Sequence, residues 1–505
     1  MKAKILKSVY IGMTLNIIFF IIIGIMKFII NREFLINLGL ENLGIMKIML
    51  NLVSYINIAE LGIYSAAAYA LYDPIVKKDS IRLNIAVNTI TFAYKIIVIA
   101  IFLLSLIVAL FMPFILKDIT ITSEIYLYWG LFVASNLLTY LYAYKITLIS
   151  ANGEYNFVII ISNISLLIVS ILQLIAIIKF RSFALFIASN FISVIISQIY
   201  YTKFIKSRFH IEKTDKKDMQ IFKNLKYLIW HKLSYIILVN TDIILISMFV
   251  SIKLAGIYGS FIMITGTILS VVLMIRSILT PKVGRFIALN NKSEIYALFS
   301  KINYLFIAIA CAIFVPLYFI IDDFVKIWLG DEIYLSNLTI LLIMANFFIS
   351  IFRISIDIFK EANGFFSDIK LPISEALINL VISLMLVFKY GLVGILIGTL
   401  VANFAIVLVA KPILAYRVCF EKNIYTVAKD YTISWMNCFI ILGISSFIIS
   451  KLNYEISNYL EFFKVGILYF LVTTTVCFTV LLPNKNFRAL LLYIIRSFHS
   501  QEHKF

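Results

Sequence analysis

The chain is built from long apolar runs, most of about 20 residues or more, separated by short polar segments. A run of this length spans the hydrocarbon core of a bilayer as an α-helix. Only 14% of the residues are charged and 62% are hydrophobic, whereas a soluble domain has roughly 25% charged residues. The sequence therefore predicts an all-α integral membrane protein with fourteen spans, near 8–30, 42–71, 85–112, 124–149, 157–178, 183–205, 227–250, 256–280, 302–321, 335–358, 372–389, 391–416, 433–451 and 460–482.

Lysine and arginine are distributed unevenly over the connecting segments. With the N-terminus in the cytoplasm, 30 of them fall in segments expected to face the cytoplasm and 9 in segments expected to face outward. Because basic residues stay on the cytoplasmic side, both termini are expected there. The first run follows Lys2, Lys4 and Lys7 without an A-x-A cleavage site and is expected to remain as the first span. Orientation and contact with anionic lipids explain the net charge of +18, so no nucleic-acid partner is expected.

Nine ionisable side chains are assigned to the predicted spans themselves, whereas those near the cytoplasmic ends of spans are counted with the connecting segments. A charge at the centre of a membrane helix costs roughly 2.5 to 3.5 kcal/mol. These side chains are therefore expected to pair with one another or to line a hydrated cavity, except that Lys27 and Lys47 can also extend to the interface from near the ends of their spans. The nine are Lys27, Lys47, Lys95, Lys232, Arg353, Glu60, Asp242, Asp357 and Glu375.

Two of the spans allow competing interpretations of their charges. Arg353 binds an anionic cargo, or it pairs with Asp357, which lies four residues on and so on the same helix face. Asp242 binds a coupling ion, or it neutralises Lys232, ten residues before it. His231 is interpreted as a packing residue, although the usual pKa of a histidine would suit a proton switch.

The two glutamates differ in their expected depth. Glu60 lies in a long helix expected to run through 42–71, where it contacts a cargo or an ion, or bonds to a neighbouring helix. Glu375 lies nearer the cytoplasmic start of its span, which favours an interfacial or inter-helix bond.

Several function classes lack the residues that they require. The four cysteines, Cys311, Cys419, Cys438 and Cys477, are scattered without CxxC spacing or a histidine cluster, so no metal site or disulfide framework is expected. No nucleotide-binding motif is visible, which argues against an ATP-driven pump. The predicted outer segments are short and contain no catalytic acidic cluster. Neither an enzyme nor a cofactor is therefore expected.

Two stretches about 212 residues apart, "NLGIMKIMLNLVSYINI" from Asn42 and "LAGIYGSFIMITGTIL" from Leu254, each enter a span through a Gly-Ile step. Repeated bundles with a site between their halves are typical of transporters. The stretches "AELGIYSAAAYALYDPIVKKD", "VNTDIILISMFVSIKLAGIYGSF", "TPKVGRF" and "EANGFFSDIKLPISEALINLVISLMLVFKYGLVGILIGTLVAN" resemble polysaccharide-unit flippases, the Wzx-type branch of the multidrug/oligosaccharidyl-lipid/polysaccharide exporter superfamily.

The resemblance implies an architecture and a cargo. It implies an N-lobe of six spans over 1–205, a basic linker over 206–226, a C-lobe of six spans over 227–416, and two further spans with a basic tail over 417–505. It also implies movement of an undecaprenyl-pyrophosphate-linked oligosaccharide across the bacterial cytoplasmic membrane, for O-antigen, capsule or another surface polysaccharide. Glycosyltransferases and a glycan polymerase would be its neighbours in that biosynthesis.

Such a cargo requires a hydrated, cationic cavity between the lobes, because lysine and arginine bind phosphate oxygens. Lys27, Lys95, Lys232 and Arg353 are the candidates for its wall. Glu60, Asp242 and Glu375 match positions of the family; these three and Asp357 are the candidates for coupling to H⁺ or Na⁺ or for inter-helix pairing. The same fold with another cargo, as in a lipid II flippase or a cation-coupled multidrug exporter, is the alternative.

Overall fold

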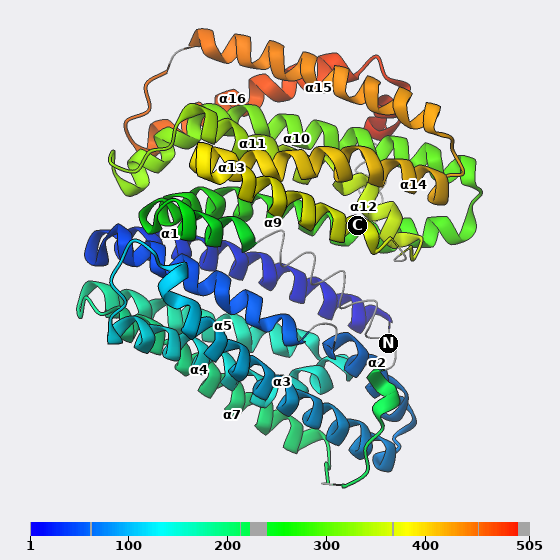
Figure 1. Cartoon of the computed structure of the whole chain (residues 1–505). Helices are drawn as coiled ribbons and strands as arrows, with labels where there is room; N and C mark the ends of the chain where they lie inside the picture. The colour runs from blue at the N-terminus through cyan, green and yellow to red at the C-terminus, as the bar shows by residue number, and fades with distance from the viewer. Residues whose placement is uncertain are drawn as a thin grey trace. The chain divides into compact units, whose positions relative to one another are not determined.

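The computed structural model describes residues 2–60, 63–212, 214–222, 240–365, 368–452 and 454–492. All regular secondary structure within these ranges is helical (Figure 1), which confirms the predicted all-α fold. Residues 1–260 and 261–505 form two compact units, called unit 1 and unit 2 below. The boundary between the units falls inside α9 (Ile252–Leu289).

Unit 1 contains long helices joined by short turns. After a helical stretch at Asn240–Phe249 it ends in the first residues of α9. Its other elements are α1 (Lys2–Ile56), the 3₁₀ turn η1 (Asn57–Glu60), α2 (Ile63–Lys77), α3 (Ser80–Ile115), α4 (Ser123–Ala151), α5 (Tyr155–Ile178), α6 (Phe183–Ala188), α7 (Asn190–Arg208) and the 3₁₀ turn η2 (Met219–Phe222).

Unit 2 continues from α9 and ends with two long helices. Within it, α16 packs against α10 and α15, around the buried residues Val315, Ile320, Ile449, Val465 and Tyr469. Its elements after α9 are α10 (Lys292–Leu329), α11 (Asn337–Phe352), α12 (Ile354–Ala362), α13 (Lys370–Ala402), the π-helical segment η3 (Asn403–Ala410), α14 (Lys411–Cys419), α15 (Ile424–Leu452) and α16 (Tyr459–Leu481).

The helices agree with the predicted spans. Among the described residues, ten helical segments are long and apolar enough to cross a membrane. Two of them, Leu15–Ile56 and Lys370–Cys419, each cover two predicted spans. A thirteenth predicted span coincides with α4, and the remaining one, 227–250, lies largely outside the described residues. Fourteen spans are therefore consistent with the structure.

Glycines with positive φ break the two longest helical segments. Gly39 in α1 has φ 84° and ψ 166°, and Gly391 in α13 has φ 54° and ψ −129°. L-residues with a Cβ rarely adopt such angles, so each glycine lets the chain change direction without a polar loop. This explains how predicted spans as close as 372–389 and 391–416 remain separate helices.

Small and polar residues hold the hairpin around Gly391 together. The Ser383 hydroxyl donates to the Ile395 carbonyl at 3.1 Å, and the Asn379 side-chain amide donates to the Thr399 hydroxyl at 3.2 Å. A Cβ on Gly398 would lie 2.2 Å from the Ser383 Oγ. The two arms therefore pack as closely as a small-xxx-small motif allows.

Candidate functional site

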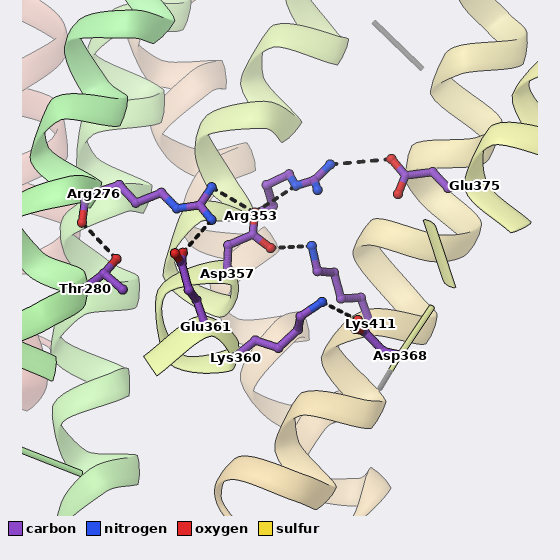
Figure 2. Close-up of polar contacts among 9 residues, drawn as sticks. All are labelled: Arg276, Thr280, Arg353, Asp357, Lys360, Glu361, Asp368, Glu375 and Lys411. Carbon is purple, nitrogen blue, oxygen red and sulfur yellow. Dashed lines mark hydrogen bonds and ion pairs between the residues drawn. The ribbon is translucent and has the colours of Figure 1, made fainter. Parts of the chain in front are cut away.

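Unit 2 contains a group of eight interacting charged side chains, called the charge cluster below (Figure 2). Its members come from α9, α12, α13 and α14, from the α11–α12 junction and from the segment before α13. Four are cations and four are carboxylates, so the cluster as a whole is electrically neutral. The members are Arg276, Arg353, Lys360 and Lys411, and Asp357, Glu361, Asp368 and Glu375.

Asp357 is the centre of the charge cluster. Its Oδ2 lies 3.1 Å from Arg353 Nε and 3.7 Å from Arg276 Nη1, while its Oδ1 pairs with Lys411 Nζ. Asp357 and Lys411 are both buried. A buried carboxylate is strongly destabilising unless it is paired, and here one carboxylate is shared by three cations.

The outer contacts of the cluster extend from the two arginines. Arg353 Nη1 lies 3.5 Å from Oε1 of the buried Glu375, and Arg276 Nη2 lies 3.0 Å from Glu361 Oε2. The side chains of Arg276 and Arg353 keep exposed fractions of 30% and 28%. Both arginines therefore combine a buried carboxylate partner with a face that is open to other molecules.

Irregular backbone places the central residues. Arg353 lies at the junction between α11 and α12, where its backbone N–H bonds to the Ile349 carbonyl. The i, i+4 spacing within the next turn brings Asp357 to it. Lys411 directly follows the π-helical segment η3 and begins α14, with Pro412 in the first turn. Proline is well accommodated there, and π-helical segments often occur at functional sites.

The charge cluster has donors with which it can bind an anion. A guanidinium group carries five N–H donors, and Arg353 uses only Nε and Nη1 in its ion pairs. An incoming phosphate could bind the remaining donors, or could replace a carboxylate such as the partly exposed Glu361. Such an exchange keeps every charge paired.

The other predicted cations belong to unit 1 or lie outside the described residues. Lys27 on α1 and Lys95 on α3 are exposed residues of unit 1. Lys47 is partly buried, and a Cβ added at Gly259 would lie 3.0 Å from its Cγ, so this glycine leaves room for the lysine stem. Lys232, like His231, lies outside the described residues.

The two predicted carboxylates of unit 1 are both bound by tyrosines. Tyr140 donates to Glu60 Oε2 at 3.1 Å, and Tyr258 donates to the buried Asp242 Oδ2 at 3.2 Å. The expectation of a continuous helix through 42–71 is wrong, because α1 ends at Ile56 and Glu60 ends the 3₁₀ turn η1. Glu60 therefore lies at a helix break, where backbone donors lack helical partners.

Sequence reasoning missed five of the eight members of the charge cluster. Arg276, Lys360 and Lys411 were interpreted as residues that orient the chain, and neither Glu361 nor Asp368 was singled out. Two of these could have been found from position alone. Arg276 and Lys411 fall within the predicted spans 256–280 and 391–416, where a charge requires a partner.

Comparison with known proteins identifies the fold. No protein-family model matches the sequence, and no curated protein sequence matches it. Among solved structures, the lipid II flippase MurJ in an inward closed conformation is similar with a TM-score of 0.64 and 14% identity, over 93% of this chain and 100% of that chain. An inward-facing multidrug resistance MATE family transporter of the MOP superfamily is similar with a TM-score of 0.58 and 13% identity, over 81% of this chain and 95% of that chain. A mutant of the Vibrio cholerae MATE transporter VcmN has a TM-score of 0.54 and 15% identity, over 84% of this chain and 99% of that chain.

These likenesses establish the fold and, with the apolar helices, a multi-pass membrane protein. The chain shares its fold with the flippase and the two transporters named above, and these neighbours are transporters rather than enzymes. Identities of 13 to 15% leave the cargo open, because one fold serves many cargoes.

Proposed function

We propose that this protein is a flippase for undecaprenyl-pyrophosphate-linked oligosaccharides, of the Wzx type. It moves each unit from the cytoplasmic to the outer leaflet of the bacterial cytoplasmic membrane by alternating access. Its termini face the cytoplasm, as the distribution of lysine and arginine predicts. The product serves the assembly of a surface polysaccharide.

The similarity to a lipid flippase along its full length carries the proposal. This chain covers all of the MurJ structure and leaves only 7% of its own length unmatched. The MATE structures are also covered almost completely, but they leave 14 to 19% of this chain unmatched. That remainder is about the length of two spans with their loops. The chain is therefore closer in extent to this lipid II flippase than to these multidrug transporters.

An apolar groove in unit 2 supports a lipid cargo. Two adjoining cavities of about 650 Å³ and about 540 Å³ share Phe404 of η3 and Trp435 and Phe439 of α15 among their lining residues. The Trp435 ring stacks on Phe352 with ring centroids 5.0 Å apart, and Phe352 directly precedes Arg353. We assign the groove to the polyprenyl tail, because its lining is almost entirely apolar and its Trp435 contacts Phe352, the residue next to Arg353 in the chain.

We assign binding of the pyrophosphate to the arginines of the charge cluster. Arg276 and Arg353 are partly exposed, and arginine binds phosphate oxygens in a bidentate manner. Cargo binding would exchange an arginine–carboxylate contact for an arginine–phosphate contact. Coupling to H⁺ or Na⁺ is assigned to the carboxylates that tyrosines hold in unit 1, Glu60 and Asp242.

Cells that lack the protein provide the test. They should lose the surface polymer and accumulate the lipid-linked unit in the cytoplasmic leaflet, and the wild-type gene should restore display. Arg353→Ala should restore none although the protein reaches the membrane, whereas the exposed control Arg417→Ala should behave as wild type. Rescue of cells depleted of their lipid II flippase, with no effect on the surface polymer, would instead assign lipid II as cargo.

A further inference from the structure

A second cationic site lies in unit 1, around a buried lysine without a carboxylate. Lys145 of α4 is only 6% exposed. Its Nζ donates to Gln198 Oε1 at 2.8 Å and to Thr202 Oγ1 at 2.6 Å, and both partners are neutral. In the described part of the chain no carboxylate pairs with Lys145, unlike Lys411 of the charge cluster. The positive charge of Lys145 is therefore hydrogen-bonded but not neutralised.

Both partners of Lys145 line a pocket on the surface of α7. The pocket has a volume of about 590 Å³ and is formed by Gln198, Ile199, Thr202, Lys203, Lys206 and Ser207. The two lysines are exposed and, within the described ranges, neither forms an ion pair. Hydroxyl groups, an amide and three cations thus converge without an anion, which is the composition of a phosphate site.

The same face of α7 continues as an apolar stripe. Ile195 and Ile199 are exposed by 52% and 58%, and they precede Lys203 and Lys206 at intervals that keep all four on one side of the helix. The cations therefore occupy one end of the stripe, next to Arg208, where α7 ends. This arrangement of cations beyond an apolar stripe would fit an amphipathic ligand that has a phosphate at one end and hydrocarbon at the other.

We propose that this pocket binds the headgroup phosphate of an anionic phospholipid. Lys203 and Lys206 contact the phosphate, and Lys145 supplies uncompensated charge behind them. The Thr202 and Ser207 hydroxyls donate to the Gln198 and Phe204 carbonyls, so the lysines make the charged contacts. The acyl chains lie along Ile199 and Ile195. The lysine distribution predicts that this end of α7 lies in the cytoplasmic leaflet, where clusters of lysine attract anionic headgroups. The site is independent of the cargo and belongs to a resident lipid.

Lipid binding to the purified full-length protein tests the proposal. Dioleoyl phosphatidylglycerol is titrated into the detergent-solubilised protein and bound lipid is counted by native mass spectrometry, with dioleoyl phosphatidylcholine as the zwitterionic reference. The variants are Lys203→Ala/Lys206→Ala, which alters only exposed residues, and Lys145→Gln. The control Arg417→Ala/Lys429→Ala removes the same number of exposed cations from unit 2.

Phosphatidylglycerol should bind the wild type and the control with affinities within twofold. The Lys203→Ala/Lys206→Ala variant should bind it about 30-fold more weakly, the loss expected for two lysine contacts at an anionic surface. Lys145→Gln should also weaken binding, and phosphatidylcholine should bind all proteins weakly. Equal binding of the two lipids, or no effect of the double substitution, would overturn the proposal.

Two competitors separate the possible sources of phosphate. Inorganic phosphate at the concentration of the lipid should not displace phosphatidylglycerol, because it makes no contact with the apolar stripe. Displacement at equal concentration would mean a site for free phosphate and would overturn the lipid assignment. Farnesyl pyrophosphate should compete no better than phosphatidylglycerol, and stronger competition would reassign the pocket to the cargo.

Discussion

Replacing Asp357 by asparagine should destabilise unit 2 more than any other single neutral substitution in the charge cluster. Asp357 is the shared partner of Arg353, Arg276 and Lys411. The arginines are partly exposed and can be hydrated, whereas Lys411 is buried and would keep an unpaired charge. Removing one partner of a buried ion pair costs about 3 to 5 kcal/mol. On the scale of a soluble domain of similar size, this lowers Tm by roughly 6 to 20 °C.

Thermal unfolding of the purified protein measures this loss, and the cluster contains its own control. Glu361→Gln also removes one carboxylate, but its pair with Arg276 joins side chains that are 45% and 30% exposed. An exposed pair is worth at most about 1 kcal/mol, so Tm should fall by no more than about 4 °C. Combining Asp357→Asn with Lys411→Met should recover much of the stability, because the orphaned charge is removed. Equal losses for Asp357→Asn and Glu361→Gln, or no recovery in the double variant, would refute this reasoning.

Three further predictions concern packing, helix docking and transport. Gly398→Val should abolish folded protein, measured as monodisperse material after purification, whereas Gly443→Ala, where a Cβ meets open space, should be neutral or slightly stabilising. Asp430→Asn should weaken the docking of α15, because two tyrosines of α10 and α14 donate to that carboxylate. The free energy of unfolding should fall by about 1 to 3 kcal/mol in a denaturant titration. An unchanged midpoint would contradict this role of Asp430. Arg353→Lys should reduce transport in a lipid-transfer assay at least tenfold, because lysine cannot bind a phosphate in a bidentate manner. The matched control is Arg417→Lys, which should transport as wild type. Full activity of Arg353→Lys would contradict this role.

The membrane spans were readable from the sequence because each must be apolar along its whole length. The sequence predicted 372–389 and 391–416 as two spans, but it showed no polar segment between them. The physical reason for their separation is the positive φ of Gly391, which requires no polar loop. The break at η1 was not predicted, because its four residues, NIAE, place only Asn57 and Glu60 as polar residues between two apolar helices.

The charge cluster shows the limit of reasoning from spacing. The Arg353–Asp357 pair follows from helical periodicity, since the two residues lie four positions apart. The contacts of Asp357 with Lys411 and of Arg353 with Glu375 cross between helices. They depend on how α12, α13 and α14 pack, and no pattern within one helix specifies that packing. A charged residue inside a predicted span therefore indicates that it has a partner, but it does not identify which residue the partner is.

Flipping in reconstituted vesicles tests the central claim most directly. The purified protein is incorporated into liposomes with a fluorescent undecaprenyl-pyrophosphate-linked oligosaccharide, and the fraction of the glycan accessible to a membrane-impermeant quencher is followed over time after one leaflet has been labelled. We expect transfer well above that of protein-free vesicles, with Arg353→Ala at the protein-free rate. The assignment would be contradicted if the wild type transferred this glycan only at the protein-free rate while the same preparation moved lipid II or exported a cationic dye.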